Sequence, residues 1–155
     1  MDKKEYRQIA EQSANGDAKA FAKLYGLIYR EMYYTAFYTL KNDDEAISAV
    51  TQTARSGFGA IGNLHSEQQF RTYMMKTLCV QIKNIFKYYT DNSLDSSQPE
   101  IKKALFELPN LERMILAMNI AGKFSCDDIA AFAGMTKIGV KKRLEHAKLK
   151  LDIED

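Results

Sequence analysis

The spacing of apolar residues constrains this chain more than any other feature, because such residues recur every three or four positions along most of its length. That spacing gathers apolar side chains on one face of an α-helix. No segment alternates apolar and polar residues for long enough to favour a β-strand. Proline, which interrupts helices, occurs only as Pro99 and Pro109, at two points where the helical spacing breaks. The sequence therefore predicts an all-α fold.

Turn and capping residues divide the first part of the chain. Asn15-Gly16 is typical of a helix end, Asp17 of a helix start, and Ser66 with Gln69 of a capping box. The apolar spacing between these signals predicts helices at about 2–13, 17–40, 43–56 and 66–89. Four helices joined by short turns would form one helical lobe over residues 1–89.

Residues 90–99 (TDNSLDSSQP) are polar and contribute nothing to a core, so they are interpreted as a linker. A second, smaller lobe would follow over residues 100–155. Its first two predicted helices lie at about 100–107 and 110–121, with a break at Leu108-Pro109. A short helix capped by Ser125 and a longer helix running from Thr136 to about Lys150 complete it.

The last two predicted helices have the form of a helix-turn-helix. Gly134 suits the tight turn, and Ala130 provides a small side chain where the second helix would cross. Residues 137–150 carry six basic side chains against one acid, Glu145, although the formal net charge of the whole chain is only +2. A local basic face indicates a polyanionic partner. An ordinary helical hairpin with a solvated, lysine-rich face remains the alternative.

Two further groups of side chains could bind an unpaired nucleic-acid strand. The aromatic residues Tyr25, Tyr29, Tyr33, Phe37 and Tyr38 share one predicted helix, and at helical spacing they are expected to belong to the core. On the helix at 66–89, an aromatic side chain and its basic neighbours could stack on bases and hold the backbone. These candidates are Arg71, Tyr73, Lys76, Lys83 and Lys87, and for Tyr73 a core position is equally open.

No catalytic or metal site can be assembled from the sequence. Cys79 and Cys126 are interpreted as small apolar side chains, and His65 and His146 are isolated. We therefore expect no enzyme activity, no cofactor and no small-molecule substrate. The N-terminus lacks the apolar region of a secretory signal, and no stretch reaches the ~20 apolar residues of a membrane span. These features predict a soluble, cytoplasmic protein.

Four segments, in order, resemble the extracytoplasmic-function group of bacterial RNA polymerase sigma factors. Residues 16–25 (GDAKAFAKLY) resemble the start of region two, and residues 70–73 (FRTY) resemble the group's Phe-Arg-Thr-Trp motif. Leu108-Pro109, followed by Arg113, resembles the opening of region four. Residues 125–149 (SCDDIAAFAGMTKIGVKKRLEHAKL) are similar to the region-four helix-turn-helix throughout.

The resemblance implies a role in transcription initiation, with promoter DNA, the RNA polymerase core and an anti-sigma factor as partners. Region two would bind the core and open the minus-ten element, to which the residues given above for the helix at 66–89 would belong. Region four would read the minus-thirty-five element. The resemblance makes the following residues candidate DNA contacts: Thr136, Lys137, Lys141, Lys142, Arg143 and Lys148.

The candidate contacts to core polymerase lie on the predicted helix at 43–56. They are Asp44, Glu45, Ser48 and Gln52. The sigma group usually carries acids further along this helix, where this chain has Ser48, Thr51 and Gln52. That difference leaves open an alternative function, a sigma-like DNA-binding regulator or a protein-binding adaptor that does not engage core polymerase.

Overall fold

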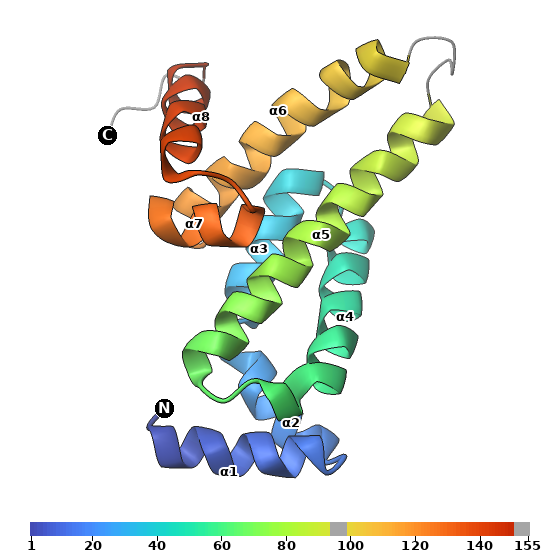
Figure 1. Cartoon of the computed structure of the whole chain (residues 1–155). Helices are drawn as coiled ribbons and strands as arrows, with labels where there is room; N and C mark the ends of the chain where they lie inside the picture. Colours follow the sequence, from blue (N-terminus) through green and yellow to red (C-terminus); the bar gives the residue numbers. More distant parts are fainter. Residues whose placement is uncertain (94–98, 151–155) are drawn as a thin grey trace.

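The computed structural model describes the backbone of residues 1–93 and 99–150, and the side chains of residues 1–88 and 110–150. Within these ranges the fold is all-α, as predicted, with no strand (Figure 1). The elements are α1 (Lys3–Ala14), α2 (Ala18–Gly26), α3 (Tyr29–Leu40), α4 (Asp43–Ala60), the 3₁₀ turn η1 (Ile61–Asn63), α5 (Glu67–Ser93), α6 (Pro99–Ile120), α7 (Cys126–Ala133) and α8 (Lys137–Lys150).

The capping residues predicted for the first part of the chain are confirmed. The Asp17 carboxylate accepts hydrogen bonds from the backbone N–H groups of Lys19 and Ala20, at 3.0 and 3.2 Å. The Ser66 hydroxyl accepts from Gln69 N–H at 3.1 Å, while the Gln69 amide oxygen accepts from His65 N–H at 2.8 Å. These bonds satisfy N–H groups that have no partner inside the helix, so they fix where α2 and α5 begin.

The prediction of one helix over 17–40 is wrong, because the chain turns at Leu27 and Ile28 and separates α2 from α3. The N–H groups of Leu27 and Ile28 bond to carbonyls three residues back rather than four, which tightens and ends α2. Gly26, just before the turn, stabilises a helix least among non-proline residues. Ile28 is fully buried, so core packing holds the turn, and no polar or proline residue marks it in the sequence.

The prediction of a helix break at Leu108-Pro109 is also wrong, since α6 runs unbroken from Pro99 to Ile120. A proline inside a helix costs about 3 kcal/mol, because it removes an N–H donor and crowds the preceding turn. The following turns bury Met114, Ile115 and Met118 completely, and this tertiary packing offsets the local cost. The side chains of residues 101–109 lie outside the described set.

The interval between the two predicted lobes is shorter than the predicted linker. Residues 90–93 continue α5 and residue 99 begins α6, which leaves 94–98 outside the described backbone. The boundary between 1–89 and 100–155 stays a prediction, but the two parts lie against each other. Helix α6 packs on α3 and α5, and α7 packs on α5, at the end of the molecule opposite α1 (Figure 1).

One continuous core joins the two parts. Its buried residues extend from Phe21 and Leu24 through Leu78 to Ile129 and Val140. At the junction the sulfur atoms of Cys79 on α5 and Met118 on α6 lie 3.9 Å apart. Both side chains are completely buried, so residues at the contact between the predicted lobes are excluded from solvent as fully as residues within each lobe.

Two basic side chains complete the junction by capping helices across it. Arg113 Nε on α6 donates to the Thr39 carbonyl in the last turn of α3, at 2.9 Å. Lys83 Nζ on α5 donates to the Ala133 carbonyl at the end of α7, at 3.1 Å. The last carbonyls of a helix lack partners and carry partial negative charge, so a cation there satisfies both needs. We refer to this pair of bonds as the reciprocal caps.

Candidate nucleic-acid interface

The turn between α7 and α8 is built by the residues that the sequence indicated. The Ser125 hydroxyl caps α7 by accepting from Asp128 N–H at 3.2 Å. Gly134 ends α7 in the left-handed conformation, at φ +68°, where a side chain would be strained. The Thr136 hydroxyl caps α8 by accepting from Gly139 N–H at 3.0 Å. A short helix, a tight glycine turn and a longer capped helix form the predicted helix-turn-helix.

Gly139 lies against the capping hydroxyl of Thr136. A Cβ atom at Gly139 would lie 3.0 Å from the Thr136 hydroxyl oxygen, closer than side chains normally approach. Glycine costs about 1 kcal/mol relative to alanine in a helix, so Gly139 weakens α8 locally.

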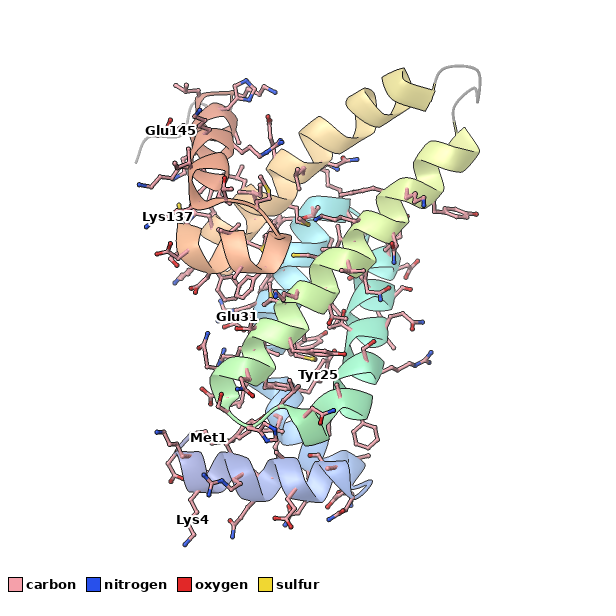
Figure 2. The ribbon with its side chains drawn as sticks, in the orientation of Figure 1. Met1, Lys4, Tyr25, Glu31, Lys137 and Glu145 are labelled. Carbon is pink, nitrogen blue, oxygen red and sulfur yellow. The ribbon has the colours of Figure 1, made fainter. Side chains whose placement is uncertain are left out.

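One face of α8 packs on the molecule and the opposite face is free. Val140, Leu144 and Ala147 are buried against α6 and α7. The spacing of 3.6 residues per turn then directs Ile138, Lys142, Glu145 and Leu149 outward, and all four are exposed. Figure 2 shows the side chains along this outer side of α8, with Lys137 and Glu145 labelled.

The candidate DNA contacts fall into two groups in the structure. Lys141 and Lys142 are exposed and have no ion-pair partner among the described residues. Lys137 is exposed but lies 3.3 Å from Asp127, an ion pair of two solvated side chains that is worth less than about 1 kcal/mol. Arg143 and Lys148 are half-buried and lie toward the packed flanks. The free positive charge therefore centres on Lys141 and Lys142.

The C-terminal half of α8 is tied to α6 through one acid. Glu112 accepts from His146 Nδ1 at 2.9 Å and from Lys150 Nζ at 3.3 Å. Burial raises the pKa of the Glu112 carboxyl, but the hydrogen bonds from His146 and Lys150 outweigh burial and leave the pKa below its usual value. The bonds therefore hold a carboxylate, which fixes the orientation of α8 on α6.

The candidate single-strand contacts on α5 do not form one surface. Lys76, Lys83 and Lys87 are exposed at helical spacing along one side of α5. Lys83 on that side is held by the reciprocal cap to α7. Arg71 pairs with Glu67 on the same helix at 3.4 Å, and the Tyr73 hydroxyl donates to the Ser56 carbonyl at 3.3 Å, which ties α5 to α4.

The candidate polymerase contacts lie together on α4. Asp44, Ser48 and Gln52 are exposed at four-residue spacing, with the half-buried Glu45 beside them. The acidic side chains are confined to the first turn, where they also complement the helix dipole. Beyond that turn the face carries uncharged polar side chains, the exposed Arg55, and Ile47, which is 47% exposed.

The aromatic residues of α2 and α3 were predicted to be core, and this is wrong for Tyr29 and Tyr38, which are 42% and 53% exposed. The rings form a ladder at i, i+4 spacing, with centroids 5.4 Å apart for Tyr25 and Tyr29 and 6.1 Å apart for Tyr29 and Tyr33. The Tyr33 hydroxyl donates to Asp43, and this bond raises the tyrosine pKa to about 12. The four-residue spacing of the tyrosines was the signal for such a ladder.

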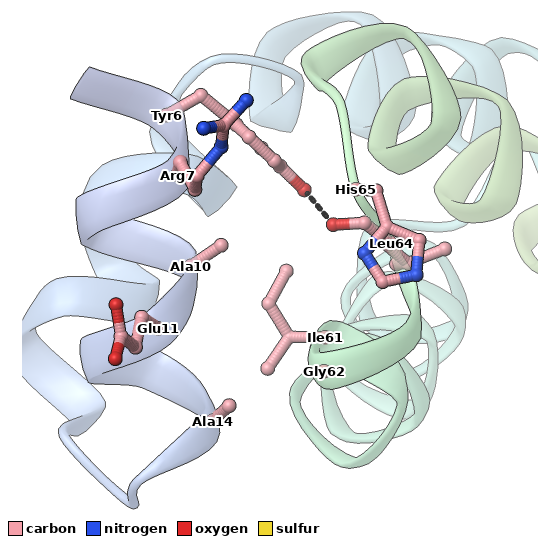
Figure 3. Close-up of a pocket in the computed structure, with 9 residues that line it drawn as sticks. All are labelled: Tyr6, Arg7, Ala10, Glu11, Ala14, Ile61, Gly62, Leu64 and His65. Atoms are coloured by element: carbon pink, nitrogen blue, oxygen red, sulfur yellow. Dashed lines mark hydrogen bonds between the residues drawn. The ribbon is translucent and has the colours of Figure 1, made fainter. Parts of the chain in front are cut away.

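A pocket of about 440 Å³ lies between α1 and η1, at the end of the molecule opposite α8 (Figure 1 and Figure 3). The Tyr6 hydroxyl crosses it and donates to the Leu64 carbonyl at 2.8 Å. Arg7, Glu11 and His65 also line it and make no ion pair with one another among the described residues. The pocket lies far from α8 (Figure 1).

Other chemical features are sparse in the described part of the chain. No three His, Cys, Asp or Glu side chains come together there as a metal site would require. Cys79 is completely buried, and burial raises the pKa of its thiol to about 12, which confirms it as an apolar side chain. Cys126 is half-buried at the start of α7. None of the described helices combines the length and apolar character needed to cross a membrane.

Comparisons of the sequence with protein-family models and with curated proteins found no match.

Proposed function

We propose that this protein binds duplex DNA through α8, and that it acts as a sigma factor directing RNA polymerase to promoters. The observation that carries the first part is that Lys141 and Lys142 are exposed on a capped second helix and have no ion-pair partner among the described residues. In helix-turn-helix proteins the N-terminal part of this helix enters the major groove, where lysines reach phosphates and guanine edges. The resemblance to sigma regions two and four supports the second part.

The dimensions of α8 suit this role. Its 14 residues give a helix about 21 Å long, and the major groove is wide enough to admit one helix. The face that would enter the groove is opposite Val140, Leu144 and Ala147, so binding needs no unfolding of the core. The ties from Glu112 to His146 and Lys150 fix the angle at which α8 would approach DNA.

The continuous core favours a second candidate, a sigma-like regulator that binds DNA without directing polymerase. The minus-thirty-five and minus-ten elements are about 25 base pairs apart, which is about 85 Å of duplex. A folded chain of 155 residues has a radius of gyration of only about 15 Å. A sigma factor of this sequence would therefore have to break the reciprocal caps and separate its lobes on polymerase, whereas a regulator would not.

DNA binding is tested by charge reversal at the proposed contacts. The double variant Lys141→Glu, Lys142→Glu should lose binding in a gel-shift titration with a mixed-sequence duplex at fixed salt. The matched control is Lys3→Glu, Lys4→Glu, which makes the same charge change at two exposed positions of α1. Equal loss in both variants would indicate a general charge effect and contradict the assignment of α8.

The two candidates are distinguished with purified bacterial core polymerase. A sigma factor should co-elute with the core on a sizing column at micromolar concentration. Its binding to core polymerase should also weaken when Asp44 and Ser48 on α4 are both changed to lysine. A folded protein that binds DNA but does not co-elute would be a regulator.

A further inference from the structure

Ile138 is conspicuous because its side chain is 69% exposed at the second position of α8. An isolated exposed apolar residue is common and by itself needs no explanation. The position is the unusual part, since around the helix Ile138 lies between Lys141 and Lys142, both of which are exposed. The N-terminal part of the face proposed to enter the groove therefore has an apolar side chain next to its cations.

The side chain has the shape for a fixed contact. A β-branched residue in a helix has essentially one preferred χ1 rotamer, so Ile138 projects as a rigid apolar group. The Thr136 cap fixes the backbone from which it projects. In the major groove the apolar group available to such a side chain is the C5-methyl of thymine.

We propose that Ile138 recognises a thymine methyl group, which makes the preferred ligand of α8 a duplex DNA with thymine at one defined position. This inference rests on the proposed DNA binding and adds a base preference to it. Lysines reach phosphates, which carry no sequence information, and guanine edges, so Ile138 adds a preference for thymine that the cations do not supply. The same contact excludes double-stranded RNA, which lacks the methyl group and has a major groove too narrow to read.

A protein-docking patch is the competing interpretation of exposed apolar residues on α8. The other such residue is Leu149, which is 79% exposed. It lies 11 positions further on, about 16 Å along the helix axis. Glu145 and Lys142 lie between the two on the same face, so the apolar surface is not continuous. The separation favours a point contact for Ile138.

The experiment removes one methyl group at a time from the DNA. The full chain is used to select a preferred duplex from a random pool, and each thymine of that duplex is then replaced by uracil, which keeps base pairing. At one position the replacement should weaken binding by about fourfold, the effect of losing one buried methyl group. The variant Ile138→Ala should bind the thymine and uracil duplexes equally, whereas Ile138→Val should still prefer thymine.

Leu149→Ala is the matched control, since it removes another exposed apolar side chain from the same helix and should keep the thymine preference. A selected duplex that tolerates uracil at every position overturns the inference, and so does an Ile138→Ala variant that keeps the preference. In both cases loss of binding on charge reversal at Lys141 and Lys142 would leave the proposed function standing. If no duplex is bound at all, the proposed function fails, and the inference with it.

Discussion

Helices α5 and α8 both carry exposed lysines, and from the sequence the lysines of both helices were predicted to contact nucleic acid. On α8 the charges of Lys141 and Lys142 have no partner among the described residues. On α5 the middle lysine, Lys83, donates to the end of α7. Exposed lysines on two helices therefore have different roles, because the carbonyl of another helix lies next to Lys83, whereas Lys141 and Lys142 face solvent.

The largest expected effect separates these two faces. Reversing both Lys141 and Lys142 to Glu should lower DNA affinity more than about 100-fold and reduce the slope of log K against log salt by about 1.8, since each lost phosphate contact contributes about 0.9. Reversing Lys76 and Lys87 on α5 should change duplex affinity by less than about threefold. A salt titration by fluorescence anisotropy measures both, and a larger effect from α5 would reverse the comparison.

The next effect compares the two cations of the reciprocal caps. Arg113→Ala should lower the free energy of unfolding by about 1–3 kcal/mol, because it leaves the partly buried Thr39 carbonyl without its charged donor. Lys83→Ala should cost less than about 1 kcal/mol, because Lys83 is exposed and water can replace its amine. Urea unfolding followed by circular dichroism gives both values, and equal costs would show that burial does not distinguish the caps.

A third test weakens α8 without touching its charges. Thr136→Ala removes the hydroxyl that accepts from Gly139 N–H and should cost about 1 kcal/mol of stability. Thermal unfolding measures this loss, with Thr136→Ser, which retains the hydroxyl, as the control. Unchanged stability in the alanine variant would mean that water satisfies the first turn of α8 equally well.

A fourth, smaller effect depends on pH. Because the folded pKa of Glu112 lies below its usual value, its ties to His146 and Lys150 stabilise the protein above about pH 4.3, and this contribution disappears as the pH falls through the folded pKa. Both partners are more than half exposed, so the contribution should be below about 1 kcal/mol. Glu112→Gln should therefore lose stability at pH 7 and match the wild type near pH 3, as measured by urea unfolding. A constant difference between the two proteins would contradict this.

The smallest expected effect concerns the acid on the outer face of α8. Glu145 is exposed beside Lys141 and Lys142, and its charge would repel phosphates. Glu145→Gln should tighten DNA binding by about two- to threefold at low salt and have no effect at high salt, where such repulsion is screened. Weaker binding would indicate instead that Glu145 accepts a hydrogen bond from a base edge.

The sequence predicted the local features of this fold well. Asp17, Ser125 and Thr136 act as caps because capping depends on a few neighbouring atoms, and Gly134 adopts its left-handed conformation for the same reason. The sequence failed where distant packing overrides local preference. The sequence pattern did not predict the turn at Ile28, which core packing stabilises. It predicted a helix end at Pro109, where α6 continues because the following turns are buried.

The candidate interface was predicted only in part, because local spacing identifies the faces of a helix but not the groups that other helices bring to them. The spacing of Val140, Leu144 and Ala147 was enough to identify the buried face of α8, and therefore its outer face. The partners of individual charges were not predictable, since Asp127, Glu112 and the Ala133 carbonyl approach their lysines only after the helices pack. The same spacing places Ile138 on the outer face, but how far its side chain is exposed could be read only from the structure.

The contact between Cys79 and Met118 has a consequence for how the molecule unfolds. Because the core is continuous across this contact, we expect the chain to melt in a single cooperative transition rather than in two. A fragment carrying only α6 to α8 would lose the packing of α3 and α5 on α6 and would expose Met118 to water, which favours aggregation. Cooperativity across this contact therefore makes the intact chain the smallest unit in which the recognition helix can be studied.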